Sequence, residues 1–373
     1  MKFEVLSSEL QSRLAACARV LNSRNPLPAL NDFLFTLKEG RLTVTASDGD
    51  NTMMTEIPVS EVEGEVTMLV AASNILSPLS NMPTQNLMVH IAENYEVTVT
   101  YQNGRFTFLG TAPDAYPARR EMEDSCQQFS ISSQALASGL QNTLFAVSTD
   151  DLRIIMNGVL VDIMPECVTF VSSDSKRLVK ASDSSVKTGL TSRFVLPKKT
   201  ASLLKNIIGK EDYPCSVTFD TRCARIALDG FEMDCRFIEG RYPNYNAVIP
   251  KNNENIMTVC RASLLSVLRR ISAFSNIATN QVKLELSRNS LQLSAQDVDY
   301  CKSGSEHVTC AYEDKPMALG LRGDFIIECL NTLTSDEVEL SLSDPARAVV
   351  LSPVCNGGNQ QVQMLLMPML LTD

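Results

Sequence analysis

The sequence predicts an α+β fold that contains three copies of one domain of about 125 residues, each with two helices packed on antiparallel sheets. Two observations support this prediction: three segments of the chain begin alike, and three polar turns recur at matching places. The length of 373 residues is typical of two or three domains. Hydrophobic residues make up 44% and charged residues 20% of the chain, a balance that excludes a disordered protein.

The three similar segments each predict a short strand followed by a helix. Each begins with alternating apolar and polar residues, continues through a Ser or Ala–Ser pair, and then places apolar residues at the spacing of one helix face. In the first segment that face consists of Leu10, Leu14 and Cys17, together with Leu21. The segments read KFEVLSSELQSRLAACARVL at 2–21, QFSISSQALASGLQNTLFAV at 128–147 and IMTVCRASLLSVLRRISAFS at 256–275.

The polar turns give the repeat its register. Asp48, Asp174 and Asp297 each follow a stretch with strand alternation, and they lie 126 and 123 residues apart. A second helix is predicted after each turn, and several short, mostly antiparallel strands complete each copy. The second helices are expected at 70–82, 196–209 and 321–333, and the domains at 1–125, 126–252 and 253–373.

Charge is unevenly distributed along the chain. The net charge of −10, taken alone, argues against nucleic-acid binding. The six predicted helix windows nevertheless contain ten basic and only three acidic residues. A basic surface made of helix faces would attract a phosphate backbone without reading bases, whereas the alternative is that these side chains only solvate the helices. The basic residues are Arg13, Arg19, Arg24, Lys198, Lys199, Lys205, Arg261, Arg269, Arg270 and Arg322.

No pattern in the sequence predicts a catalytic or metal site. The chain lacks GxGxxG, GxxxxGK[ST], HExxH and GxSxG motifs, and its two histidines and eleven cysteines show no zinc-ligand spacing. The pairs Asp48/Asp50 and Asp297/Asp299 could suggest a metal site, but turn formation explains them better. We therefore expect no cofactor and no enzymatic activity.

The sequence also favours a cytoplasmic protein. The longest apolar stretch, MLLMPMLL at 364–371, is too short to cross a bilayer, and the N-terminus lacks the apolar run of a signal peptide. An odd number of cysteines without an export signal fits free thiols in a reducing compartment. We expect these cysteines to be buried and structural.

Several motifs make the chain similar to the bacterial DNA sliding clamp family, the beta subunit of DNA polymerase III. They are MKF at the start, SRNPLPALNDFLF at 23–35, IMNGVL at 155–160, GRYPNYNAVIPKN at 240–252 and LLMPMLL at 365–371. The resemblance implies a head-to-tail homodimer that closes a six-domain ring around duplex DNA, with helices lining the hole. It implies no cofactor, and as partners the DNA polymerase III alpha subunit, an ATP-driven clamp loader and other proteins with a clamp-binding motif.

The resemblance and the helix charges together suggest which side chains contact DNA. Ser73 and Asn74 stand where a family member can carry basic residues, so DNA contact from that helix is doubtful. The expected DNA-binding residues are Arg24, Arg153, Lys198, Lys199, Arg269 and Arg270.

The resemblance further implies a pocket between the second and third domains that binds short, largely apolar partner peptides. Ser175 stands in place of a common Gly, Ala247 and Leu370 in place of Arg, and Phe325 in place of Tyr, so the peptide preference can differ from that of relatives. A buried final strand is the alternative interpretation of LLMPMLL. The implied pocket residues are Met156, Ser173, Ser175, Lys176, Arg177, Leu178, Pro243, Ala247, Val248, Thr279, Arg322, Phe325, Ala346, Ala348, Leu365, Leu366, Met367, Pro368, Met369, Leu370 and Leu371.

The ring seam is expected between the third domain of one protomer and the first domain of the other. Ala273 and Phe274 would face Arg105, Phe106 and Phe108. Acidic residues near Asp297, Asp299 and Glu306 could pair with Arg105. Two other functions stay open at this point, a repeat-built scaffold protein and a carbohydrate- or nucleotide-processing enzyme.

Overall fold

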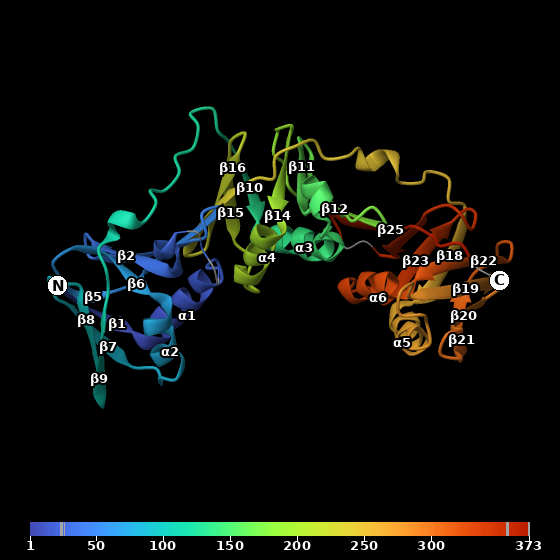
Figure 1. The fold of residues 1–373 in the computed structure, drawn as a ribbon. Helices are drawn as coiled ribbons and strands as arrows, with labels where there is room; N and C mark the ends of the chain where they lie inside the picture. The colour runs from blue at the N-terminus through green and yellow to red at the C-terminus, as the bar shows by residue number, and fades with distance from the viewer. Residues whose placement is uncertain (23–24, 26, 356–357, 372–373) are drawn as a thin grey trace. The chain divides into compact units, whose positions relative to one another are not determined.

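The computed structural model describes residues 1–22, 25, 27–355 and 358–371 of the chain (Figure 1). Its contacts divide the chain into two compact units. The first comprises Met1–Gln134 and Asn206–Phe237, and the second comprises Ala135–Lys205 and Ile238–Asp373. No helix within the described ranges is long and apolar enough to cross a bilayer.

Every α-helix of the described residues follows directly on a strand, as the repeated strand–helix openings predict. Each helix lies inside the segment in which it was predicted. The first one ends at Ala18, before Leu21, the last residue of its predicted apolar face. The helices are α1 (Ser7–Ala18), α2 (Ala72–Ser80), α3 (Ser133–Thr143), α4 (Lys198–Ile207), α5 (Arg261–Ser272) and α6 (Gly323–Thr332).

The strands recur in the same way along the chain. The first third holds β1 (Lys2–Leu6), β2 (Asp32–Lys38), β3 (Arg41–Ser47), β4 (Asn51–Ile57), β5 (Ser60–Glu63), β6 (Val66–Ala71), β7 (Asn86–Ile91), β8 (Glu96–Tyr101) and β9 (Gly104–Leu109). The second holds β10 (Gln127–Ser132), β11 (Gly158–Met164), β12 (Cys167–Ser173), β13 (Arg177–Asp183), β14 (Ser192–Pro197), β15 (Pro214–Phe219), β16 (Cys223–Leu228) and β17 (Phe231–Arg236). The last holds β18 (Asn255–Cys260), β19 (Gln281–Ser287), β20 (Ser290–Asp297), β21 (Lys302–Ala311), β22 (Met317–Arg322), β23 (Glu337–Leu342), β24 (Val349–Pro353) and β25 (Gln360–Leu366).

Antiparallel sheets organise both units. In the first unit, β5-β1-β7-β8-β9 form one sheet and β10-β15-β16-β17-β4-β3-β2-β6 form another. Helix α1 contacts β1 of the first sheet and β3 and β4 of the second. In the second unit a single sheet runs β14-β11-β12-β13-β25-β24-β23-β18-β21-β20-β19-β22, and α5 contacts β18, β20 and β21. The α+β fold class predicted from the sequence is confirmed.

The predicted helix faces form the cores. Helix α1 buries Leu10, Leu14 and Cys17, and α5 buries Leu268 and Ile271 among others. Burying each such aliphatic side chain stabilises the fold by roughly 2 kcal/mol. Within each helix pair, α1 contacts α2 and α5 contacts α6, as Figure 1 shows.

Two strand pairs join successive repeats into continuous sheets. In the first unit β4 pairs with β17, and in the second unit β13 pairs with β25. The two junctions are equivalent: β4 and β13 both begin after the repeated polar turn, and β17 and β25 both come late in their repeats. The sequence patterns predicted the repeats but not this pairing.

The corresponding strands at the two ends of the repeat array keep free edges. Strand β9 occupies the position of β17 and β25 in the first repeat, and β8 is its one described neighbour. Strand β21 occupies the position of β4 and β13 in the third repeat, and residues 302–309 of it pair only with β20 in the described part of the chain. An unpaired edge exposes a row of N–H and C=O groups that can pair with another strand.

The sequence predicts polar turns at all three repeated aspartates, and the side chains of the first two close their turns by hydrogen bonds. Oδ1 of Asp48 accepts hydrogen bonds from the backbone N–H groups of Asp50 (3.0 Å) and Asn51 (2.7 Å). Oδ1 of Asp174 accepts in the same way from the N–H groups of Lys176 and Arg177, both at 2.9 Å. Each carboxylate thus accepts hydrogen bonds that a backbone carbonyl would otherwise accept, and this stabilises the turn between the two strands.

The expectation that the cysteines are buried is only partly right. All eleven are free thiols, and six of them are buried. Burial raises the pKa of Cys223 and of Cys215 to about 11. The expectation is wrong for Cys126, Cys260, Cys301 and Cys355, which are exposed, because they lie on outward-facing positions or in turns where strand alternation places a side chain in solvent.

Candidate functional site

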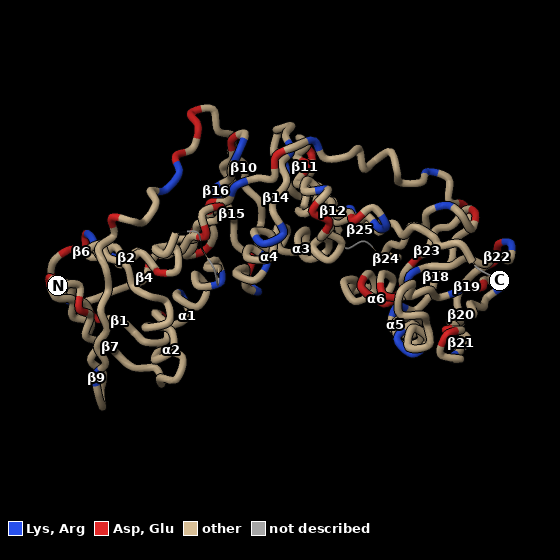
Figure 2. The backbone as a smooth tube through the Cα atoms, viewed as in Figure 1, with Lys and Arg blue, Asp and Glu red and all other residues tan. Residues whose placement is uncertain are grey.

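The basic side chains expected to meet DNA lie mainly on two helices. Figure 2 shows Lys and Arg on α4 and α5, whereas α6 carries Asp and Glu. Lys198 and Lys199 begin α4, where Lys198 is exposed and Lys199 half-buried. Helices α2 and α3 carry no charged side chain. Arg24 lies outside the described residues.

The two arginines at the end of α5 have partners on neighbouring elements. Nη2 of Arg269 donates a hydrogen bond of 2.7 Å to the side chain of Asn331. Arg270 forms an ion pair of 2.5 Å with Glu306 of β21, and this hydrogen bond raises the pKa of Arg270 and lowers that of Glu306. Both arginines stay exposed and can exchange these partners for phosphate oxygens.

A cluster of buried side chains, here called the apolar floor, lies where β13, β25 and β24 pair side by side. Leu178 and Leu365 face each other across β13 and β25, and the buried Ala348 lies just before β24. Two tyrosines of the RYPNY motif complete it, and burial together with a hydrogen bond to Asp162 raises the pKa of Tyr245 to about 12. The floor consists of Leu160, Val171, Leu178, Val195, Tyr242, Tyr245, Ala348, Val350 and Leu365.

Several of the expected pocket residues lie around this floor. Ser173 ends β12, and Ser175 lies in the β12–β13 turn next to Lys176, whose carbonyl accepts a 3.0 Å hydrogen bond from the N–H of Met367. Met156 is buried, and its Sδ lies 4.0 Å from Oγ of Ser175. The segment that carries Tyr242 and Tyr245 also places Pro243, Ala247 and Val248 in exposed positions. Ala346 is exposed, and Leu366 is buried at the end of β25.

Two guanidinium groups lie against Phe325 of α6. Cζ of Arg177 lies 4.2 Å and Cζ of Arg322 4.6 Å from the centroid of the ring. Arg177 is only 8% exposed and forms ion pairs with Asp174 and Glu328. Arg322 forms an ion pair of 2.6 Å with Asp324, so both arginines have partners inside the protein.

The C-terminal segment is both a buried strand and an exposed tail. Strand β25 ends at Leu366, and the tail then returns to the sheet at Met369, whose N–H donates a 2.8 Å hydrogen bond to the carbonyl of Gly320. Gln281 donates a 3.0 Å hydrogen bond to the carbonyl of Leu370, while the Leu370 side chain is 88% exposed. The tail residues are Met367, Pro368, Met369, Leu370 and Leu371.

The residues expected at the ring seam lie on the free edge of β9 and, in the third repeat, just after α5 beside β21. On β9, the rings of Phe106 and Phe108 stack with centroids 6.2 Å apart, and Arg105 is exposed. Ala273 and Phe274 follow α5. The Phe274 ring packs closely on Gly304 of β21, where an added Cβ would lie only 2.6 Å from Cδ2 of the ring.

Two of the three acidic residues expected to pair with Arg105 have other roles. The expectation is wrong for Asp297, which is 2% exposed and accepts a hydrogen bond of 3.5 Å from Asn276. Side chains along β20 point alternately inward and outward, and Asp297 occupies an inward position. Glu306 already forms an ion pair with Arg270, so it can bind Arg105 only if its carboxylate is shared between the two arginines.

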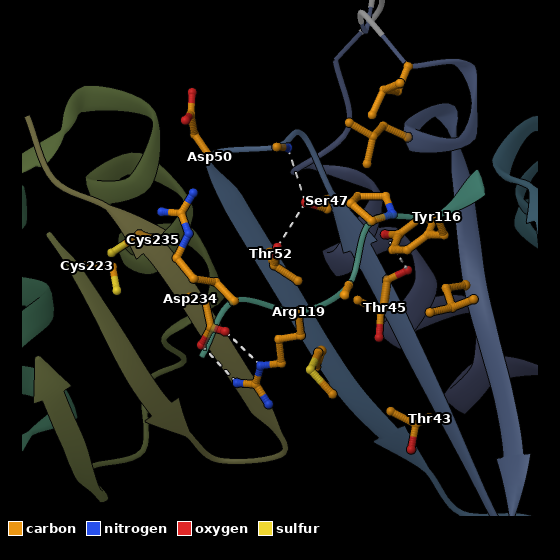
Figure 3. A pocket seen from close by; sticks show the side chains of 18 of the residues that line it. Thr43, Thr45, Ser47, Asp50, Thr52, Tyr116, Arg119, Cys223, Asp234 and Cys235 are labelled. Carbon is orange, nitrogen blue, oxygen red and sulfur yellow. Dashed lines mark hydrogen bonds and ion pairs between the residues drawn. The ribbon is translucent and has the colours of Figure 1, made fainter. Parts of the chain in front are cut away.

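A cavity of about 510 Å³ lies in the first unit, away from the expected site residues. It lies between the sheet that contains β2, β3, β4 and β17 and the segment of residues 116–122, which connects the first repeat to the second (Figure 3). Figure 3 shows Arg119 reaching from that segment to Asp234 of β17, and Nε of Arg119 donates a 2.7 Å hydrogen bond to Oδ2. Burial alone would raise the pKa of Asp234, but the hydrogen bonds and charges of Arg119 and Arg225 outweigh it and hold this pKa below its usual value.

A second cavity, of about 660 Å³, lies beside β19, β20 and β21 in the second unit. Of the expected pocket residues it includes only Thr279 and Leu371. Within the described ranges, no group of three His, Cys, Asp or Glu side chains is placed to hold a metal ion.

Comparison with known protein families identifies the repeat. Family models for the DNA polymerase III beta subunit match in order: the N-terminal domain over residues 1–120, the central domain over 130–244 and the C-terminal domain over 246–370. The chain belongs to this family. The resemblance seen in the sequence motifs is confirmed, and with it the domain type of the DNA polymerase III beta subunit in each repeat.

Members of the family match the chain from end to end. The beta sliding clamp of Haemophilus influenzae is 24% identical over 99% of this chain and 100% of the relative, and that of Synechococcus elongatus is 26% identical over 99% of both. The sliding clamp structure from Pseudomonas aeruginosa has 20% identity and a TM-score of 0.93 over 100% of both chains, which shows the shared fold. Clamps from Pseudomonas aeruginosa and Bartonella birtlesii have been crystallised with bound griselimycin.

Sequence reasoning missed several residues that lie among or beside the expected pocket residues. Tyr242 and Tyr245 stand in the motif that signalled the family, yet only the structure shows that their rings belong to the apolar floor. Phe145 and Glu328, which hold Arg177, were also missed, and nothing in the local pattern around Phe145 distinguishes it. An acidic residue on a helix as apolar as α6 is the one signal that could have indicated Glu328.

Proposed function

We propose that this chain is a non-catalytic processivity factor of DNA replication, which closes as a head-to-tail homodimer around duplex DNA. The observation that carries the proposal is the pair of equivalent junctions, β4–β17 and β13–β25, together with the free edges of β9 and β21. A third junction of the same kind needs β21 of one copy and β9 of another. Two copies joined twice in this way leave neither β9 nor β21 with a free edge, since a head-to-tail contact that closes generates a ring.

The helix charges support sequence-independent contact with DNA. Lys198 and Lys199 on α4, and Arg269 and Arg270 on α5, offer cations to phosphates, while the overall charge of −10 keeps DNA away from the remaining surface. Contacts of this kind hold the duplex without fixing its position, so the ring can slide. Retention on DNA then depends on the ring staying closed. No cofactor takes part in this function.

The apolar floor and its surroundings are the proposed docking site for partner proteins. Leu, Met and Tyr side chains provide an adaptable apolar surface, and the exposed Met367 directly follows β25, whose Leu365 belongs to the floor. The partners would be the DNA polymerase III alpha subunit, the clamp loader and other proteins that present a short, largely apolar peptide. The griselimycin complexes of two related clamps support this assignment. No feature of the described residues favours a scaffold or a carbohydrate- or nucleotide-processing enzyme.

The solution mass and the particle shape test the assembly. Light scattering should give twice the chain mass of 41.0 kDa, and negative-stain electron microscopy should show rings with a central hole and a pseudo-sixfold outline. Compact particles or open crescents would contradict the proposed closure. A Val354→Asp variant, altered at an exposed apolar residue outside the two free edges, serves as the control and should form the same rings.

A further inference from the structure

Ser175 connects the β12–β13 turn to the segment that precedes β11. Its φ of 75° lies in the left-handed region that favours glycine. Its Oγ accepts a hydrogen bond from Nη1 of Arg153 and donates to Sδ of Met156 at 4.0 Å. Its backbone N–H donates to Oγ of Ser173 at 3.1 Å. A glycine would suit this backbone better, but it would lose both contacts made by the hydroxyl.

The segment that Ser175 contacts is the short 3₁₀ element η4 (Asp151–Met156). Its first turn is capped by Asp150, whose Oδ1 accepts a 3.0 Å hydrogen bond from the N–H of Leu152. Its end is held by the carbonyl of Met156, which accepts from the N–H of Ser148 at 3.1 Å. Between these anchors Arg153, with φ −127° and ψ 55°, interrupts the helix.

The hydroxyl of Ser175 determines where the Arg153 guanidinium lies. The other partner of that guanidinium is the carboxylate of Asp150, at 4.0 Å, and both of these side chains are about half exposed. An exposed pair at that separation contributes little. The contact with Ser175 therefore draws Arg153 towards the β12–β13 turn.

The same hydroxyl contacts Met156, which directly follows a residue of the apolar floor's surroundings. Met156 is 7% exposed, and the preceding residue, Ile155, packs directly on the floor. We infer that Ser175 is a positioning residue of the peptide site, which holds Met156 at the edge of the floor and assigns Arg153 to that site instead of to DNA. This inference rests on the proposed function, because it concerns the same peptide site.

Positioning of this kind lowers the cost of binding. A flexible side chain that is ordered before the ligand arrives loses less conformational freedom when the ligand binds. Loss of the tether lets Arg153 and Met156 sample other rotamers, so peptide-site ligands should bind about two- to tenfold more weakly. The effect should depend on the Ser175 hydroxyl and the Arg153 guanidinium together.

Calorimetric titration of the full-length protein with griselimycin tests this inference. We expect Ser175→Ala and Arg153→Ala each to weaken binding about two- to tenfold, and the double variant to be no weaker than either single variant. Ser175→Gly should lose as much as Ser175→Ala, which separates the hydroxyl contact from backbone strain. Lys187→Ala, which removes an exposed cation paired with Glu166, should bind like the wild type.

Retention on circular DNA provides the second measurement. Arg153→Ala should remain on a nicked circular plasmid as long as the wild-type protein does. Three results would overturn the inference. The first is an unchanged griselimycin affinity in Ser175→Ala, and the second is a double variant whose loss of affinity is the product of the two single losses. The third is an Arg153→Ala protein that leaves circular DNA sooner but binds griselimycin normally. If the wild-type protein itself does not bind griselimycin, the proposed peptide site fails, and the role of Ser175 fails with it.

Discussion

The guanidinium of Arg177 lies over the ring of Phe325, with 4.2 Å between Cζ and the ring centroid. Arg177 belongs to β13 of the second repeat and Phe325 to α6 of the third. Nη2 of Arg177 also donates a 2.8 Å hydrogen bond to the carbonyl of Phe145, and Nε donates one of 3.0 Å to Asp174. One buried cation thus joins two repeats of the second unit beside the proposed peptide site.

Replacing Arg177 with alanine should destabilise the second unit strongly. The change leaves Asp174 and Glu328 without their cation and opens the space over Phe325. Breaking a buried ion pair costs about 3 kcal/mol, which a denaturant titration of the full-length protein measures. Lys187→Ala removes an exposed ion pair and should change the free energy of unfolding by less than about 1 kcal/mol. Equal losses in the two variants would mean that burial of Arg177 contributes nothing.

Asp234 predicts a specific dependence of stability on pH. Its pKa is lowered in the folded protein, because the hydrogen bonds from Arg119 and Arg225 outweigh its burial. A lowered pKa gives a contribution that is present above the unfolded-state value, near 3.8, and is lost as the pH falls through the folded-state value. Asp234→Asn should therefore be less stable than the wild type by about 2 kcal/mol between pH 5 and pH 7.

The difference between Asp234→Asn and the wild type should shrink as the pH falls from 5 towards 3. Urea titrations at several pH values measure it. Glu96→Gln, altered at an exposed residue of β8 whose described contacts include no ion pair, is the control and should show no such pH-dependent difference. A difference that stays constant down to pH 3 would show that the carboxylate of Asp234 does not anchor the connecting segment through its charge.

Gly158 is predicted to be essential for the pairing of β11 with β14. A Cβ at this position would lie 2.3 Å from the carbonyl oxygen of Leu196 and 2.8 Å from Cγ1 of Val195. Gly158→Ala therefore forces the two strands apart and should cost about 3 kcal/mol in unfolding free energy. Gly209→Ala has open space around the new methyl group and should change stability by less than about 1 kcal/mol. Near-equal thermal midpoints for the two variants would contradict this account of the β11–β14 contact.

Phe274 is predicted to be necessary for dimer formation. Its ring is 39% exposed and lies against Gly304 on the free edge of β21. A charge at this place cannot be buried against the apolar residues of β9, so Phe274→Asp should be a monomer of 41.0 kDa in light scattering. Met164→Asp alters a residue of similar exposure, 45%, at the end of β11, and should leave the dimer intact. A Phe274→Asp protein that keeps the dimer mass would place the seam elsewhere.

The helices and the repeat could be predicted because their signals are local and occur three times. The apolar spacing of Leu10, Leu14 and Cys17 indicates a helix with one buried face, and the recurring turn aspartates fix the register between copies. Strand alternation likewise shows which residues face inward. It does not show which strands meet, so the β4–β17 and β13–β25 junctions required the structure.

The arrangement of the candidate site could not be predicted from the sequence. Leu178 and Leu365 are brought together by strand pairing, which no spacing in the sequence reveals. The contact of Arg153 with Ser175, whose hydroxyl also contacts Met156, could not be predicted either. Side-chain contacts between distant segments depend on packing and on rotamers, and these leave no periodic trace in the sequence.

The most direct test of the central proposal compares retention on circular and linear DNA. The protein is placed on a nicked circular plasmid by its cognate loader and ATP, and gel filtration in high salt separates bound from free protein. Topological binding predicts that the protein stays on the circle in high salt and leaves as soon as the plasmid is cut once, because the ring slides off the ends. Equal retention on the circular and the linear plasmid, or loss from both as salt rises, would show ordinary electrostatic binding and contradict encirclement.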